Sequence, residues 1–460
     1  MDKIKNTESR VSISILLSLL FLLGCLGTTA LRADDDSAGE AKTDTEQPEE
    51  DERATDRPVT TGLIGGNTSD PDVLLDQIMN SRVVNRESLF GRAPITPLHK
   101  VTERWSNDFY DKTNIRVGTS IHHLFTWLTD EIPGEDDFGT ATDVDFITRW
   151  DIPNLGETTR SSLTFHLEGR WDWGTTGPMT IGTPSLGMLG SVGNSFARYT
   201  PVAIIRNLYW RTENTDKKGA FRIGKITPDG IYGTTRHLTP NNACLSFPCT
   251  GAFVVGVPDS GIGFTGAWQF NDRFKIIGGI NDANANRFDF GDVGKGKFFK
   301  AIDFNVKIAP VTEKAGFSRF LLWQVDEAGG SNGATGAKGW GYLILLEQEL
   351  SSDGSLVGIA KYGRSMKGSA AYERQAAIAL VKYEPDWISR VNNDSVGASF
   401  SIFRAIVDGA QMERNLELWY RFPVTPDTQA SLHYQGIFNP SLRFDKDYAS
   451  AWSIRFTTSF

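Results

Sequence analysis

Charged and hydrogen-bonding residues recur at every second position in several stretches of this 460-residue chain. In an extended strand such spacing places them on one face, opposite large apolar side chains. Their carboxylate, guanidinium, imidazole and amide groups could exchange hydrogen bonds with a neutral polar solute moving along that face. Alternatively, they pair with one another and stiffen a wall without touching a solute. The residues that parity places on a polar face are Asp145, Arg149, His166, Glu168, Arg170, Asp172, Arg222, Glu417, Arg421 and Gln435.

A hydrolytic site is the competing chemistry. Ser120 and His122 share one face of a predicted strand, as the hydroxyl and base of a barrel-embedded hydrolase would. No nucleophile motif or orienting acid accompanies them, and strand neighbours two positions apart are common by chance. The glycine-rich stretches lack the phosphate-loop pattern. We therefore predict that the chain is not an enzyme, and we expect no nucleotide, metal or other cofactor.

Two of the three cysteines, Cys244 and Cys249, are separated by four residues. In an exported protein this spacing favours a small disulfide-closed loop. A metal site would need more ligands than the nearby His237 offers. The sequence thus predicts a disulfide and no metal.

Alternation with period two begins near residue 113 and continues to the last residue, which predicts strands with two chemically different faces. About sixteen strands are expected. They cover residues 115–127, 144–150, 161–173, 202–212, 219–226, 261–270, 274–280, 302–308, 317–326, 340–350, 356–362, 374–382, 395–403, 416–422, 430–438 and 448–460.

Strand length and spacing indicate how these strands close. Many approach ten residues, the length that a tilted strand needs to cross a bilayer, and short turns alternate with long connections at 174–200, 227–260 and 281–297. Residues beyond the N-terminal apolar run contain no stretch apolar enough for a membrane helix, so a membrane location requires a closed barrel. A soluble all-β protein is the alternative. Tryptophans at strand ends and the export signal favour an all-β transmembrane antiparallel barrel of about 16 strands.

The last strand supports insertion into a bacterial outer membrane. Trp452, Ile454, Phe456 and the terminal Phe460 share one face. A final strand that ends in Phe resembles the signal recognised by the barrel-assembly machinery. We therefore expect the lipid bilayer and that machinery as partners.

The N-terminal part divides into three segments. Residues 1–33 predict a cleavable signal peptide, although the stretch that ends at Cys25 resembles a lipobox and leaves lipidation open. Residues 34–68 predict an acidic disordered linker, since 34–57 holds 11 Asp and Glu against 3 Lys and Arg and no aromatic residue. Residues 69–112 predict a short helical, periplasmic or plug segment: Asp70 can cap a helix and Pro71 suits its first turn. The barrel would span 113–460.

Several patches resemble the carbohydrate-selective porin family of the OprB type. They are residues 413–426 (ERNLELWYRFPVTP), 433–440 (HYQGIFNP), 207–210 (NLYW), 222–225 (RIGK) and 244–249 (CLSFPC). The resemblance covers most of residues 100–460 and is strong only in these patches. It implies a sixteen-stranded barrel with inward-folded loops and a polar, arginine-containing constriction for sugars.

The resemblance and the polar faces together predict a passive, carbohydrate-selective porin of the bacterial outer membrane, with glucose or small oligosaccharides as solutes. A general diffusion porin and a structural or adhesive barrel are the alternatives. A basic nucleic-acid footprint is absent, because residues 58–460 carry 43 acidic and 40 basic side chains. The particular sugar, the constricting loop, the role of the acidic linker and the choice between a monomer and a homo-oligomer stay open.

Overall fold

The structure is a computed structural model that describes residues 57, 62–66, 68–84, 86–91, 96–153, 158–194, 196, 202–308, 316–328, 335–385, 387–388 and 390–460. The predicted signal peptide, the lipobox cysteine and nearly all of the predicted acidic linker lie outside these residues. The account below concerns the described residues alone.

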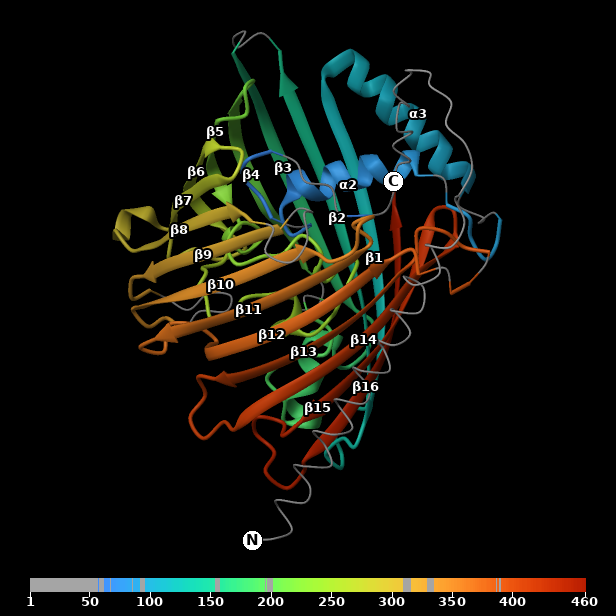
Figure 1. Cartoon of the computed structure of the whole chain (residues 1–460), viewed down its shortest axis with the longest axis vertical. Coiled ribbons are helices and arrows are strands. Elements are labelled where there is room, and N and C mark those ends of the chain that lie inside the picture. The colour runs from blue at the N-terminus through green and yellow to red at the C-terminus, as the bar shows by residue number, and fades with distance from the viewer. Residues whose placement is uncertain are drawn as a thin grey trace, which may run out of the picture. The chain divides into compact units, whose positions relative to one another are not determined.

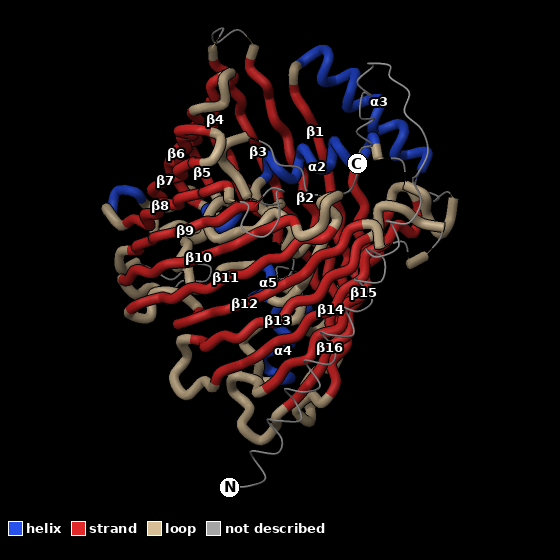
Figure 2. Tube along the Cα trace, viewed as in Figure 1, coloured by secondary structure: helices blue, strands red, loops and turns tan. Residues whose placement is uncertain are grey.

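Sixteen antiparallel strands close into one barrel, in which each strand pairs with its neighbours in sequence and β1 pairs with β16 (Figures 1 and 2). The predicted fold class is confirmed. The strands are β1 (Ile115–Thr129), β2 (Phe138–Ile152), β3 (Thr159–Asp172), β4 (Val202–Asn214), β5 (Gly219–Ile226), β6 (Gly261–Asn271), β7 (Phe274–Asp282), β8 (Phe298–Lys307), β9 (Gly316–Val325), β10 (Gly339–Glu349), β11 (Leu356–Met366), β12 (Tyr372–Tyr383), β13 (Ser395–Ala405), β14 (Met412–Thr425), β15 (Thr428–Phe438) and β16 (Tyr448–Ser459).

Some strands are longer than their sequence pattern predicts. β2 begins at Phe138, six residues before the predicted start at Val144. In these six residues Gly139 and Ala141 face inward and threonines face outward, so the alternation in size and polarity is weak. Pairing with β1 extends the strand where side-chain pattern alone does not predict it.

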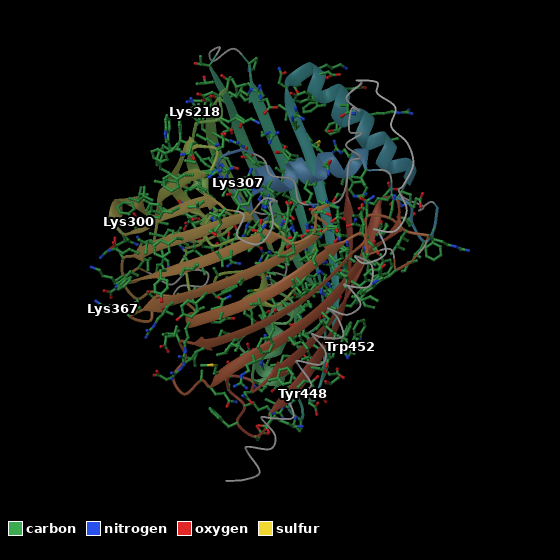
Figure 3. The ribbon with its side chains drawn as sticks, in the orientation of Figure 1. Lys218, Lys300, Lys307, Lys367, Tyr448 and Trp452 are labelled. Carbon is green, nitrogen blue, oxygen red and sulfur yellow. A yellow bond between two sulfur atoms is a disulfide. The ribbon has the colours of Figure 1, made fainter. Side chains whose placement is uncertain are left out.

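The outer surface carries the large apolar side chains. Trp127, Trp150, Trp268, Trp340 and Trp452 are between 41 and 55% exposed, although each belongs to a strand with a buried opposite face. Trp452 and Tyr448 lie on the exterior of the barrel in Figure 3. An apolar exterior with tryptophans near strand ends is the arrangement that a bilayer stabilises.

The connections differ sharply between the two barrel ends. At the end that holds the C-terminus, even-numbered strands lead into connections that range from two residues between β14 and β15 to eleven residues between β12 and β13. At the other end the chain makes its longest excursions, residues 173–201 between β3 and β4 and residues 227–260 between β5 and β6. The first contains α4 (Pro178–Leu186), and the second contains η1 (Pro228–Gly230) and α5 (Phe247–Thr250). A short η2 (Val293–Lys295) lies between β7 and β8.

Among the described residues, two helices precede the barrel, α2 (Pro71–Val83) and α3 (Thr96–Thr113). As the sequence predicts, Asp70 is the N-cap of α2, its side chain accepts a hydrogen bond from the Asp72 N–H, and Pro71 occupies the first turn. In Figure 1 α2 lies close to the C-terminus at the short-turn end, with α3 beside it. Within the described part of the chain, no helix combines the length and apolarity needed to cross a membrane.

Candidate permeation pathway

The ten polar residues singled out by parity all lie on the inner face of the barrel. Eight are buried, whereas Arg149 and Asp172 are partly buried. They do not form one cluster. The structure divides eight of them among a charged patch on β2, β3 and β4, a set of contacts to α2, and a set of contacts to the two long loops. Arg421 lines a cavity beside α2, and Asp172 lies at the end of β3.

The charged patch joins neighbouring strands through ion pairs. Asp145 on β2 accepts from His166 on β3 at 2.8 Å between Oδ1 and Nε2. Glu168 accepts from Arg170 at 2.5 Å and from Arg206 of β4 at 3.1 Å. These carboxylates and bases satisfy one another across the wall, as the structural alternative predicts.

A carboxylate triplet within this patch has metal-like spacing. Oxygens of Asp143, Asp145 and Glu168 lie within 4.8 Å of one another. Arg170 and Arg206 already neutralise Glu168, and Arg170 also approaches Asp143 at 3.9 Å. The bound guanidinium groups take the place of a cation, so the patch is an ion-pair network.

The second group holds α2 against the inner wall. The Asp72 carboxylate is fully buried and accepts from Arg211 at 3.0 Å and from Arg222 at 2.9 Å. Thr164 of β3 donates to the same carboxylate at 3.0 Å. Arg222 also pairs with Asp70, and its guanidinium lies over the Tyr209 ring at 4.9 Å. We call these contacts the aspartate clamp.

The clamp determines the charge state of its central acid. Burial alone would raise the pKa of Asp72, but Arg222, Arg211 and Arg149 outweigh that effect and hold the pKa below its ordinary value. Asp70, with Arg222 as its main cationic neighbour, has its pKa raised by burial. Asp72 is thus the member of the clamp that stays ionised down to low pH.

Further contacts fix the rest of α2. Arg149 of β2 donates to Asp76 at 3.0 Å. The apolar side of the helix, which includes Leu75 and Ile78, packs against Ile147. Gly118 of β1 permits this approach, because a Cβ atom built there would lie 2.7 Å from the Leu75 side chain.

The third group holds the two long loops inside the barrel. Glu417 of β14 is fully buried and accepts from the Leu245 and Ser246 N–H groups at 2.6 and 2.9 Å. Gln435 of β15 donates to the Val192 carbonyl at 2.8 Å. Residues of both long loops therefore contact the inner wall. The inward-folded loops implied by the family resemblance are present.

Wall cations bind loop carbonyls in the same region. Lys361 donates to the Cys249 and Gly251 carbonyls at 2.6 and 2.7 Å. Arg455 donates to the Pro240 and Ala243 carbonyls. A buried cation bound to several carbonyls replaces its lost hydration, so each of these side chains is committed to holding a loop.

The two loop cysteines form a disulfide. Cys244 and Cys249 are bridged, with Cα atoms 6.3 Å apart, and both are buried beside wall residues that include Trp419. His237 lies on the same loop and contacts the Tyr383 hydroxyl through Nδ1 at 2.7 Å. Burial lowers the pKa of His237 to about 4, so it is neutral at pH 7.

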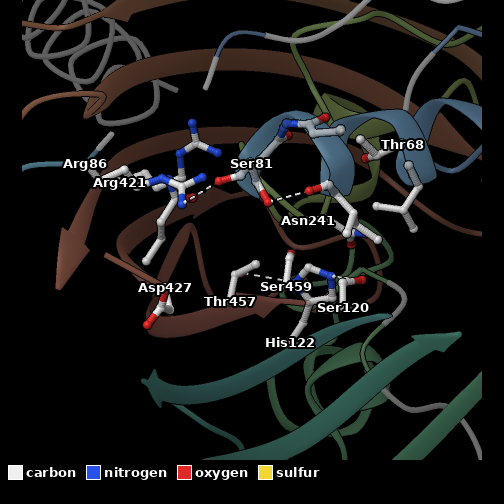
Figure 4. Close-up of a pocket in the computed structure, with 15 residues that line it drawn as sticks. Thr68, Ser81, Arg86, Ser120, His122, Asn241, Arg421, Asp427, Thr457 and Ser459 are labelled. Carbon is white, nitrogen blue, oxygen red and sulfur yellow. Dashed lines mark hydrogen bonds between the residues drawn. The ribbon is translucent and has the colours of Figure 1, made fainter. Parts of the chain in front are cut away.

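A cavity lies between α2, the β5–β6 loop and the wall formed by β1, β14, β15 and β16 (Figure 4). Its volume is about 50 Å³. The side chains that the strands and the long loop contribute to its lining are polar. The lining includes Thr68 and Ser81 of the N-terminal segment, Asn241 of the long loop, and Ser120, His122, Arg421 and Thr457 of the strands.

A second cavity, of about 90 Å³, lies between the start of α2 and the long loops. Ser69, Asn194, Asp229, Thr250 and Phe253 contribute to its lining. Asp229 pairs with Arg206 through one carboxylate oxygen and leaves the other without a hydrogen-bond partner among the described residues. The cavity thus combines an aromatic face with hydrogen-bonding groups, the combination that suits a polyhydroxy solute.

The Ser120 and His122 pair does meet, but not in the geometry of a catalytic triad. His122 Nε2 is 3.1 Å from the Ser120 hydroxyl, and Asp145 approaches that same nitrogen at 3.9 Å. Nδ1, which an orienting acid would have to occupy, contacts the Thr457 hydroxyl at 3.0 Å. The arrangement is a wall hydrogen-bond chain.

Two functional arginines on β4 were not predicted from the sequence. Arg206 belongs to the charged patch, and Arg211 belongs to the aspartate clamp. The register between β3 and β4 shifts at His166 and Leu167, so Arg206 and Asn207 both point inward and the parity of β4 changes there. Two polar residues in succession, Arg206 and Asn207, between the apolar stretches 202–205 and 208–210 are the sequence signal that could have indicated this bulge.

No family model matches the chain, and no curated protein matches its sequence. Solved structures do match. The high-pH structure of Pseudomonas putida OprB has a TM-score of 0.63 and 13% identity, over 77% of this chain and 96% of that chain. The low-pH structure of the same protein has a TM-score of 0.48 and 11% identity, over 82% and 100% of the two chains. A variant of the Rh. blastica porin has a TM-score of 0.46 and 8% identity, over 75% and 99%. The chain therefore has the fold of a porin.

Proposed function

We propose that this protein is an outer-membrane porin through which sugars diffuse passively. The observation that carries the proposal is the contrast between an apolar, tryptophan-bearing exterior and an interior lined with carboxylates, guanidinium groups, hydroxyls and amides. A bilayer stabilises such an exterior, and a polar interior replaces the hydrogen bonds that a solute loses with its water. Porins conduct solutes and carry out no reaction.

The charge balance of the interior favours neutral solutes. The predicted lumen residues occur in opposite-charge pairs, such as Glu168 with Arg170 and Arg149 with Asp76. Such a wall presents many donors and acceptors without a strong field of one sign. This supports sugars over phosphates or other anions, as does the fold shared with OprB, a protein of the carbohydrate-selective family that the sequence resembles.

The orientation and route of export belong to the same proposal. The short-turn end, which holds the C-terminus, faces the periplasm, and the long-loop end faces outward. The signal peptide over residues 1–33, and recognition of Trp452, Ile454, Phe456 and Phe460 by the assembly machinery, complete the pathway to the outer membrane.

Conductance in planar bilayers tests whether the barrel is a pore for sugars. We expect purified protein to give discrete ion-conducting steps, and added glucose or disaccharide to reduce the current through each open channel as sugar occupies the lumen. Discrete steps that sugars do not alter would favour a general diffusion porin. The absence of steps from a correctly folded, inserted barrel would favour a structural or adhesive role.

A further inference from the structure

Residues 62–66 and 68–84 lie against the inner wall of the barrel, and the start of this stretch borders both cavities. Thr68 lines the cavity beside α2, and the next residue, Ser69, lines the cavity toward the long loops. On the opposite side, Asn241 lines the first cavity and Pro240 lines the second. The same two stretches of chain therefore border both cavities and lie between them.

We propose that this N-terminal segment, residues 62–66 and 68–84, is the selectivity element of the pore, and that Thr68 and Ser69 form with Pro240 and Asn241 a constriction selective for neutral polyhydroxy solutes. The inference rests on the proposed porin function. A segment that precedes the first barrel strand would thus sort solutes by size and charge.

The size of the cavities supports a narrow point here. Their volumes are about 50 and 90 Å³. An apolar cavity of about 150 Å³ accommodates benzene, and a hexose has twice as many heavy atoms as benzene. Neither cavity is as large as a hexose, so a sugar would pass this point only if the segment shifts, and added bulk at Thr68 or Asn241 would hinder that passage.

The chemistry at this point suits hydroxyl-bearing solutes. The Thr68 hydroxyl is buried and has no hydrogen-bond partner among the described residues. The amide of Asn241 lies across the same cavity in Figure 4. Because a buried unpaired hydroxyl is costly, a passing solute that pairs with it gains a favourable contact.

The aspartate clamp determines both the position and the charge of the constriction. Asp70 and Asp72 immediately follow Thr68 and Ser69, and they bind Arg222 and Arg211 of the wall. Arg222 also donates to the Ile64 carbonyl at 3.2 Å, which ties down the chain on the other side. Without the two aspartates, the constriction would lose its anchor and two buried arginines would lose their counter-charges.

The charge of the clamp is tested with the double variant Asp70→Asn and Asp72→Asn, whose side chains keep their size. We expect a several-fold larger single-channel conductance, a reversal potential in a salt gradient that shifts toward anion selectivity, and faster entry of trisaccharides into proteoliposomes. An assembled double variant with wild-type conductance, selectivity and sugar cut-off would overturn the proposal.

A second variant decides the matter if the double variant does not assemble. Thr68→Leu adds bulk and removes the hydroxyl, and it should reduce sugar flux several-fold while the barrel remains folded. Thr175→Leu, on the exposed part of the β3–β4 connection, is the matched control and should leave flux unchanged. Equal flux in wild type and Thr68→Leu would contradict the constriction. A wild-type barrel that passes no sugar would instead contradict the porin function itself.

Discussion

The two sides of the barrel interior hold their contents by different chemistry. On β2, β4 and β5, wall arginines bind the side chains of Asp70, Asp72 and Asp76, so a charge stands on each side of every contact. On β11, β14 and β16, Lys361, Glu417 and Arg455 bind backbone groups of the long β5–β6 loop. The first arrangement depends on aspartate side chains, whereas the second depends on the course of the loop backbone.

We therefore expect the aspartate clamp to affect which solutes pass, and the loop contacts to affect mainly the stability of the loop. A side-chain clamp can be changed by one substitution without altering the loop, and it carries the charge that a solute would meet. A backbone-bound loop tolerates many side-chain changes but fails when its wall partner is lost, because the orphaned N–H groups stay buried. Substitutions on the two sides should therefore fail in different ways.

Arg222→Met should have the largest effect on stability. It removes the shared partner of Asp70 and Asp72 and leaves carboxylates buried, at a cost of about 3–5 kcal/mol. Urea unfolding of the reconstituted protein, followed by tryptophan fluorescence, measures the loss. Arg364→Met is the control, because its pair with Glu373 is partly exposed and should contribute less than about 1 kcal/mol. Equal losses in both variants would mean that the clamp does not stabilise the barrel.

Glu417→Gln should cost about 2 kcal/mol, since a neutral amide oxygen accepts the Leu245 and Ser246 N–H groups more weakly than a carboxylate does. The observable change should differ from the change seen when the aspartate clamp is lost. Protease should cut the β5–β6 loop sooner, while ion selectivity changes little. A change in selectivity as large as that of the aspartate double variant would erase the distinction between the two sides.

The double variant Cys244→Ser and Cys249→Ser should lose about 2 kcal/mol, because the ring that the disulfide closes is short. Its loop should nevertheless keep its contacts to Lys361 and Glu417. Unfolding midpoints with and without a reducing agent test this, and the double variant should be insensitive to the reductant. A loss of sugar selectivity in this variant would show that the loop backbone alone does not hold the constriction.

Mild acid should destabilise the protein through His237 of the β5–β6 loop. The free energy of unfolding should fall by about 2 kcal/mol between pH 7 and pH 5. Its pKa is about 4 in the folded protein and about 6.5 when unfolded, so the unfolded state binds more protons between these values and stability falls as pH decreases from 6.5 toward 4. Glu347, Arg236 and Tyr383 surround it. Unfolding midpoints at pH 7 and 5 give the size of the effect, and His237→Gln should remove this part of the pH dependence. Asp72, with its lowered pKa, should contribute only below about pH 4.

The barrel could be predicted closely because its strands alternate against two different solvents. All sixteen predicted strands occur, and each of the ten polar residues points inward. Periodicity reports the direction of a side chain but not the partner it finds. Arg222 and Glu417 look alike by parity, yet one binds the N-terminal helix and the other binds a loop.

The sequence pattern fails where local geometry breaks the period or where distant segments meet. The bulge on β4 turns Arg206 inward against the parity expected from its neighbours. The inward course of residues 227–260 depends on long-range contacts to β11, β14 and β16, which no local signal reports. The helix at Pro71–Val83 was predictable from its cap, but the sequence left its location open between the periplasm and a plug in the barrel.

Swelling of proteoliposomes tests the central claim most directly. Vesicles that contain the purified protein are diluted into isosmotic glucose or disaccharide, and into amino acids of similar size, with protein-free vesicles as the control. A carbohydrate-selective pore predicts that the sugars enter faster than the amino acids. Equal rates for sugars and amino acids, or no swelling above the protein-free control, would contradict it.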